Sequence, residues 1–164
     1  MFETNNVEKI AIFVDVQNIY YTTREKYRAH FDYNHFWHVV ATEKEVVVAN
    51  VYAIASKHEK QRQFHHILRG IGFEVKLKPF LQRKDGTAKG DWDIGIALDI
   101  YDISKEVDRV ILLSGDGDFE VLVDRVKKTS NAKFDVFGVP SLTSQSLIDV
   151  CDNFTPIDET FLLL

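Results

Sequence analysis

The fold is set by residues 110–119, which read Val-Ile-Leu-Leu-Ser-Gly-Asp-Gly-Asp-Phe. Four consecutive apolar residues are typical of a strand that is buried on both faces, in the middle of a parallel sheet. Two glycines then permit a sharp turn, and Asp116 and Asp118 stand where the strand ends. From Phe119 onward, apolar residues recur at helical spacing. Ligands of open α/β sheets bind beyond the carboxyl ends of the strands, so this turn is a candidate site, although Asp and Gly are also ordinary turn residues.

A second apolar run, residues 10–14, repeats this arrangement. It ends on Asp15 and leads into a helical stretch that reaches about residue 29. Further strands are predicted at 46–54, 73–78 and 134–139, with a strand at an edge of the sheet at 154–157. Helices are predicted at 33–41, 59–69, 93–104 and 144–150. Strands that alternate with helices predict an α/β fold, with a mainly parallel sheet covered by helices on both faces.

Composition sets the broad class of protein. A chain of 164 residues is long enough for one domain, which we expect to span residues 1–164. The single cysteine, Cys151, excludes an intrachain disulfide and a metal site built from cysteines, and it fits a reducing compartment. No apolar run approaches the roughly 18 residues of a membrane span, and the first residues do not resemble a signal peptide. We therefore expect a cytoplasmic protein without membrane contact.

The formal net charge of −5 conceals an uneven distribution. Residues 49–89 contain nine Lys or Arg against three acids, whereas residues 90–164 contain six against fifteen. One segment is suited to a polyanion and the other to cations. The alternative is a solvated surface on which charges happen to be sorted by sign.

Three histidines, His58, His65 and His66, lie in the basic segment. His65 and His66 are adjacent in a predicted helix, so they point about 100° apart and cannot both hold one ion. We expect solvated or phosphate-facing histidines here. Gly70 and Gly72 are predicted to end that helix, and the polar residues 82–89 are predicted to form a loop.

The acids offer a better metal site, because several stand at strand ends or at the start of a helix. Clustered carboxylates require a cation, and hard oxygen ligands suit Mg²⁺ or Mn²⁺. Such ions promote in-line displacement at a phosphodiester. Asp93 and Asp99 are six residues apart, about 240° around a helix, so they cannot both face one ion. The candidates are Asp15, Asp93, Asp116 and Asp118, with Asp99 peripheral.

Three motifs resemble those of the NYN domains of the PIN-like nuclease superfamily, and most closely the LabA-like group. They are Phe-Val-Asp-Val-Gln-Asn at 13–18, Lys-Gly-Asp-Trp-Asp at 89–93 with Asp99 six residues on, and Ser-Gly-Asp-Gly-Asp-Phe at 114–119. The resemblance extends from about residue 9 to residue 155. It implies a three-layer α/β/α sandwich and metal-dependent cleavage of RNA.

The resemblance also implies roles for individual residues. Asp15, Asp93 and Asp116 are the expected metal-facing acids, and Asp118 is expected to support them in catalysis. Two further positions match polar site residues of the family, Asn18 and Ser114. Asp99 matches a family position too, but the helix geometry places it behind the others.

Other folds with an acid at a strand end fit less well. Haloacid-dehalogenase-type phosphatases need a second acid two residues after the first, where this chain has Gln17. A MIDAS-type metal site needs Asp-x-Ser-x-Ser, whereas residues 15–19 read Asp-Val-Gln-Asn-Ile. A non-catalytic regulatory module that binds nucleic acid or protein is a separate alternative. The complete acid set favours the nuclease, because clustered carboxylates without a function would only destabilise the fold.

The predicted partner is single-stranded RNA, held by cations near the acids. Trp92, between two acids, is the preferred base-stacking residue, ahead of Tyr20 and Tyr21. The sequence leaves open the identity of the RNA, a homodimer, and the number of metal ions. The predicted phosphate-binding residues are Arg83, Lys84 and Lys89, with Lys60, Arg62 and Arg69 on the basic helix.

Overall fold

A six-stranded parallel sheet forms the centre of the computed structural model, which describes residues 6–79, 81–82, 88–89 and 91–164. The strand order is β4-β3-β1-β7-β8-β9, and every neighbouring pair is parallel. The strand predicted from the opening motif is β7, and it lies between β1 and β8 with nearly every side chain buried. The bounds are β1 Lys9–Asp15, β3 Glu45–Ile54, β4 Glu74–Lys78, β7 Arg109–Leu113, β8 Lys133–Gly138 and β9 Asn153–Pro156.

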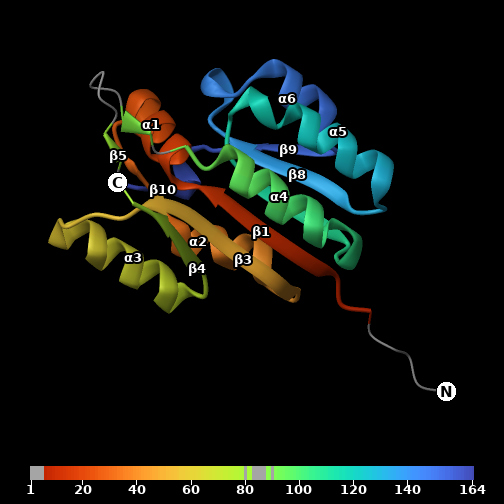
Figure 1. The fold of residues 1–164 in the computed structure, drawn as a ribbon, viewed down its shortest axis with the longest axis horizontal. Helices are drawn as coiled ribbons and strands as arrows, with labels where there is room; N and C mark the ends of the chain where they lie inside the picture. The colour runs from red at the N-terminus through yellow and green to blue at the C-terminus, as the bar shows by residue number, and fades with distance from the viewer. Residues whose placement is uncertain (1–5, 80, 83–87, 90) are drawn as a thin grey trace.

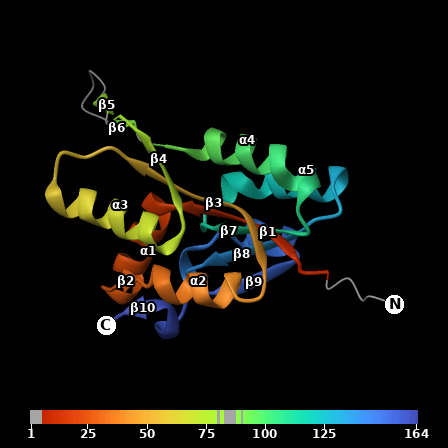
Figure 2. The same cartoon turned by 90° about the horizontal axis from the view of Figure 1, so that it is seen from below.

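Helices cover both faces of this sheet, so the predicted three-layer α/β/α sandwich is confirmed (Figure 2). Alternate residues of β1 show why: Ile10, Ile12 and Val14 belong to one apolar cluster, and Ala11 and Phe13 to the other. Among the described residues, no helix has the length and apolar character that a membrane span needs. One face carries α1 (Val16–Tyr27), α2 (Tyr33–Ala41) and α3 (Glu59–Ile71), and the other carries α4 (Asp93–Ile103), α5 (Glu120–Thr129) and α6 (Gln145–Val150).

The strand order reverses between β1 and β7. From β1 the chain proceeds to β3 and β4 on one side, and it then returns to β7, β8 and β9 on the other side (Figure 1). Parallel pairing sets Val14 of β1 beside Leu113 of β7, so both strands end at the same edge. In open α/β sheets the ligand crevice lies beyond the carboxyl ends of the strands at such a reversal. The fold therefore places Asp15 and the turn after β7 where a site is expected.

Some local predictions were wrong. Gly70 lies within α3, and Gly72 alone ends the helix, with φ of 138°. Residues 82–89 were predicted to be a loop, but its two ends belong to the antiparallel pair β5 (Leu81–Gln82) and β6 (Ala88–Lys89), while residues 83–87 lie outside the described residues. The pair was missed because two ladder pairs are too few to leave a periodic pattern. For the same reason the antiparallel pair β2 (His30–Phe31) and β10 (Leu162–Leu163) was missed.

Candidate metal centre

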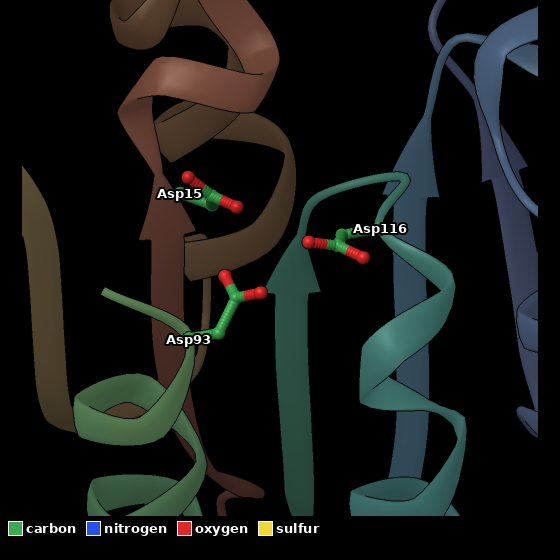
Figure 3. A group of neighbouring side chains, drawn as sticks. All are labelled: Asp15, Asp93 and Asp116. Atoms are coloured by element: carbon green, nitrogen blue, oxygen red, sulfur yellow. The ribbon is translucent and has the colours of Figure 1, made fainter. Parts of the chain in front are cut away.

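Three carboxylates converge at the reversal of the strand order. Asp15 ends β1, Asp93 begins α4, and Asp116 lies in the turn after β7. Each offers one oxygen atom, and these oxygens all lie within 4.8 Å of one another (Figure 3). Three oxygens this close fit the ligand shell of one hard divalent cation. The structure thus brings together the three acids that the sequence motifs selected.

Asp15 is held by hydrogen bonds from both sides of the strand reversal. Its side chain is 9% exposed, and it accepts the backbone N–H of Asn18 at the start of α1 at 3.4 Å. The Ser114 hydroxyl donates to the other carboxylate oxygen at 3.1 Å. Burial raises the pKa of Asp15 to about 6, although these two hydrogen bonds oppose the shift; the nearby charge of Asp116 adds to it.

Asp93 is the first residue of α4, and its backbone N–H donates to Asp91 Oδ1 at 2.6 Å. Burial, followed by the adjoining carboxyl groups of Asp116 and Asp91, raises the pKa of Asp93 to about 8. The acids therefore share a proton at neutral pH when no cation is bound, since neighbouring like charges cannot all be ionised at low cost. A divalent cation would take the place of that proton.

The turn after β7 is locked to the start of α1. Ser114 Oγ accepts the backbone N–H of Asp116 at 3.2 Å, and Asn18 Oδ1 accepts that of Gly115 at 2.9 Å. Asp116 caps the short 3-10 helix Gly117–Phe119 by accepting the N–H of Asp118 at 2.9 Å. Ser114 and Asn18 thus orient the acids. A side chain at Gly115 would collide with the backbone oxygen of Leu142, with a Cβ only 2.8 Å away, so this turn requires glycine.

Asp118 and Asp99 lie outside the group of three. Asp118 is exposed, two residues beyond Asp116. Asp99 accepts the Tyr52 hydroxyl at 2.7 Å and pairs with Lys76 Nζ at 3.0 Å. These contacts join α4 to β3 and β4, and the partner that an acid in an apolar helix requires is therefore Lys76. The sequence carried no signal for this network, because its members come from three separate elements.

Trp92 anchors the start of α4. Its Nε1–H donates to the carbonyl oxygen of Ala53 at 2.8 Å. Its ring packs edge-on against the Tyr52 ring, with the ring centres 5.2 Å apart. Lys78 Nζ lies 4.5 Å from the centre of the Trp92 ring. A base that stacks on that face of Trp92 would have to displace this ammonium group. The predicted RNA contacts Arg83 and Lys84, and the side chain of Lys89, lie outside the described residues.

One histidine prediction was wrong. His65 was expected to be solvated or phosphate-facing, but it is buried, and burial lowers its pKa. The reason is its position on α3, one turn before the buried Leu68 on the face that packs against the sheet. His66, about 100° further around the helix, is exposed.

The donors fit a hard divalent cation. In the described part of the chain, the grouping contains carboxylates alone, without histidine or thiolate. Carboxylate oxygens of this kind suit hard cations better than softer metals. The geometry therefore defines a candidate metal centre on an α/β sheet, with its carboxylates supplied by one strand end, one helix start and the turn after a second strand.

Comparisons with known proteins agree with the motifs. The model of the NYN domain family matches residues 9–158, and the chain belongs to that family. It is LabA-like within the family: the low amplitude and bright protein LabA of Synechococcus elongatus is 26% identical over 161 residues, covering 92% of this chain and 84% of LabA. A crystal structure of a protein of unknown function from Vibrio parahaemolyticus has a TM-score of 0.94 and 64% identity, covering 99% of this chain and 100% of that one. The family assignment made from three motifs is confirmed.

Proposed function

We propose that this protein is a divalent-metal-dependent ribonuclease that cleaves phosphodiester bonds in single-stranded RNA. The observation that carries the proposal is the convergence of Asp15, Asp93 and Asp116 within 4.8 Å at the reversal of the strand order. The family is one of nuclease-like proteins with RNA-related functions, which gives the acids a chemistry. The buried, unpaired Cys151 accords with a reducing compartment, and we place the activity in the cytoplasm.

In this proposal Asp15, Asp93 and Asp116 hold Mg²⁺ or Mn²⁺. A bound ion of this kind acts as a Lewis acid toward a phosphodiester and helps to generate the attacking nucleophile from water. The chain itself supplies orientation. Ser114 and Asn18 keep Asp15 and the turn in fixed positions, and the Asp91 carboxylate holds the backbone at the start of α4. Asp118, exposed beside the turn, is assigned a supporting role in proton transfer.

The test is cleavage of a fluorescently labelled, unstructured RNA by purified protein, with Mg²⁺, with Mn²⁺ and with EDTA. Cleavage is expected with either ion and not with EDTA. Asp116→Asn should reduce the rate at least about a hundredfold, the scale on which one strong electrostatic contact contributes to catalysis. The matched control is Asp102→Asn, which changes an exposed acid on α4 and should leave the rate unchanged.

RNA binding and RNA cleavage should respond to different substitutions. Asp15→Asn should reduce cleavage more than RNA binding, whereas charge reversal at Arg83 and Lys84 should reduce binding more than the chemical step. Wild-type protein that binds RNA but cuts none, with both metals and several substrates, would establish the non-catalytic binding module instead.

A further inference from the structure

A cleft of about 1360 Å³ opens beside Asp15. One wall is α1, and the other is formed by the residues after β3 and by the first turns of α3; these two helices lie on the same face of the sheet (Figure 2). Its lining includes Asp15 of the metal centre, Trp92, which directly precedes Asp93, and His30 of β2. Single small-molecule sites usually have volumes of about 300–1,000 Å³. The cleft is thus large enough for more than one nucleotide.

The α1 wall carries two exposed aromatic rings. Tyr20 is 41% and Tyr21 62% exposed, and their rings meet edge-on with centres 5.8 Å apart. Because α1 begins directly after Asp15, these residues lie about 7–9 Å along the helix axis from that acid, at 1.5 Å per residue. Exposed aromatic rings at this distance from a cleaved phosphate are suited to stacking on the neighbouring bases.

The opposite wall carries two lysines. Lys57 and Lys60 line the cleft and are exposed. Of the described residues that line it, Asp15 is the sole acid, and that acid belongs to the metal centre. A ligand that fits the cleft has negative charges on the side that faces the lysines and aromatic rings on the side that faces α1. A single nucleic-acid strand has both properties.

We propose that this cleft binds the unpaired bases next to the cleaved phosphodiester, an inference that rests on the proposed ribonuclease function. Tyr20 and Tyr21 stack on the bases, and Lys57 and Lys60 contact the phosphates. Paired bases cannot present their faces to the α1 wall, so the cleft itself imposes the requirement for a single strand. The strand leaves the metal centre along the groove between α1 and α3.

The test uses the full chain with Asp116→Asn, so that binding is measured without cleavage. The probe is a fluorescein-labelled single-stranded RNA of twelve nucleotides, followed by fluorescence anisotropy. On this background, Tyr20→Ala with Tyr21→Ala should weaken binding at least tenfold, and so should Lys57→Glu with Lys60→Glu. The matched controls are Tyr101→Ala, which is 40% exposed on α4, and Lys105→Glu with Lys133→Glu at the opposite edge of the sheet. They should change the affinity less than twofold.

Tyr21→Ala alone is a second variant, because its exposed side chain can be removed without disturbing the core. Equal losses in cleft and control variants, no loss in either, or an RNA duplex that competes as well as the single strand would each overturn the proposal. The proposal would also be overturned by a protein that binds the wild-type chain without displacing RNA and that no longer binds the cleft variants. Wild-type protein that never cuts RNA, combined with selective loss of binding in the cleft variants, would refute the ribonuclease and leave the cleft assignment standing.

Discussion

The Ser114 hydroxyl donates a 3.1 Å hydrogen bond to Asp15 Oδ2, across 99 residues of sequence. Both side chains are buried, and the same hydroxyl accepts the backbone N–H of Asp116. One serine therefore connects two of the three clustered acids, and it fixes the end of β1 relative to the turn after β7.

Ser114→Ala should destabilise the metal-free protein. Removing the hydroxyl leaves a buried carboxylate without its side-chain donor, a loss of about 1–3 kcal/mol in the free energy of unfolding. Urea unfolding monitored by circular dichroism at pH 8 measures it. The control is Ser141→Ala at an exposed site, which should stay within about 0.5 kcal/mol of wild type. An equal effect of the two substitutions would mean that the hydrogen bond to Asp15 contributes nothing.

Mg²⁺ or Mn²⁺ should raise the melting temperature. An ion that binds only the folded state stabilises it by about 2.7 kcal/mol at a concentration one hundred times its Kd. For a domain of this size that is several degrees, at about 2–4 °C per kcal/mol. Asp116→Asn should raise the melting temperature without metal, because a repulsive charge is lost, and should abolish most of the gain with metal. Differential scanning fluorimetry with EDTA as reference tests both; wild type that does not respond to either ion would count against the metal centre.

The metal-free protein should lose stability as pH rises from 5 to 9. The pKa values of Asp15 and Asp93, about 6 and about 8, both lie above the ordinary value of 3.8. Raised pKa values mean that the folded state holds these protons more tightly than the unfolded state, so the favourable contribution is complete below about pH 4 and is lost as pH passes 6 and then 8. Asp93→Asn should flatten the upper part of this profile. A melting temperature that rises over the same range in wild type but not in Asp93→Asn would reverse the assignment.

Bound metal should reverse that trend, since the cation competes with the shared proton. The metal-induced increase in melting temperature should be larger at pH 8 than at pH 6. Isothermal titration calorimetry in two buffers of different ionisation enthalpy should detect proton release on binding. Affinity that is independent of pH would show that these carboxyl groups are not the ligands.

Asp99→Asn should affect stability more than chemistry. The substitution weakens the contacts with Tyr52 and Lys76 that join α4 to β3 and β4, for an expected loss of about 1–3 kcal/mol. Because Asp93 begins the same helix, a modest decrease in the cleavage rate should follow, far smaller than that of Asp93→Asn. Equal loss of activity in the two variants, with unchanged stability, would mean that Asp99 acts directly at the metal centre.

The sequence allowed prediction of those features that depend on residues close together along the chain. A run of apolar residues followed by an acid indicates a strand end. The positions of Asp15 and Asp116 and the order of strands and helices could therefore be predicted. The separation of Asp93 from Asp99 followed from helical geometry alone. The fold brings the three acids together because β1 and β7 pair in parallel and end at one edge.

Contacts between elements far apart in the sequence could not be predicted in this way. The bond from Tyr52 to Asp99, the burial of His65 and the anchoring of Trp92 on Ala53 each depend on which elements pack together. The cleft beside Asp15 depends on the space left between α1 and α3, which no local pattern encodes. Two-residue strands such as β2 and β10 also lack a periodic signal.

The central claim is that Asp15, Asp93 and Asp116 form one metal centre, and anomalous diffraction from a crystal soaked in Mn²⁺ at pH 8 tests it most directly. The account predicts an anomalous peak between the three carboxylates, with oxygen distances of about 2.0–2.2 Å, and no such peak in Asp116→Asn crystals under the same conditions. Manganese bound elsewhere in the wild-type protein, with these three carboxylates left without a peak, would contradict it.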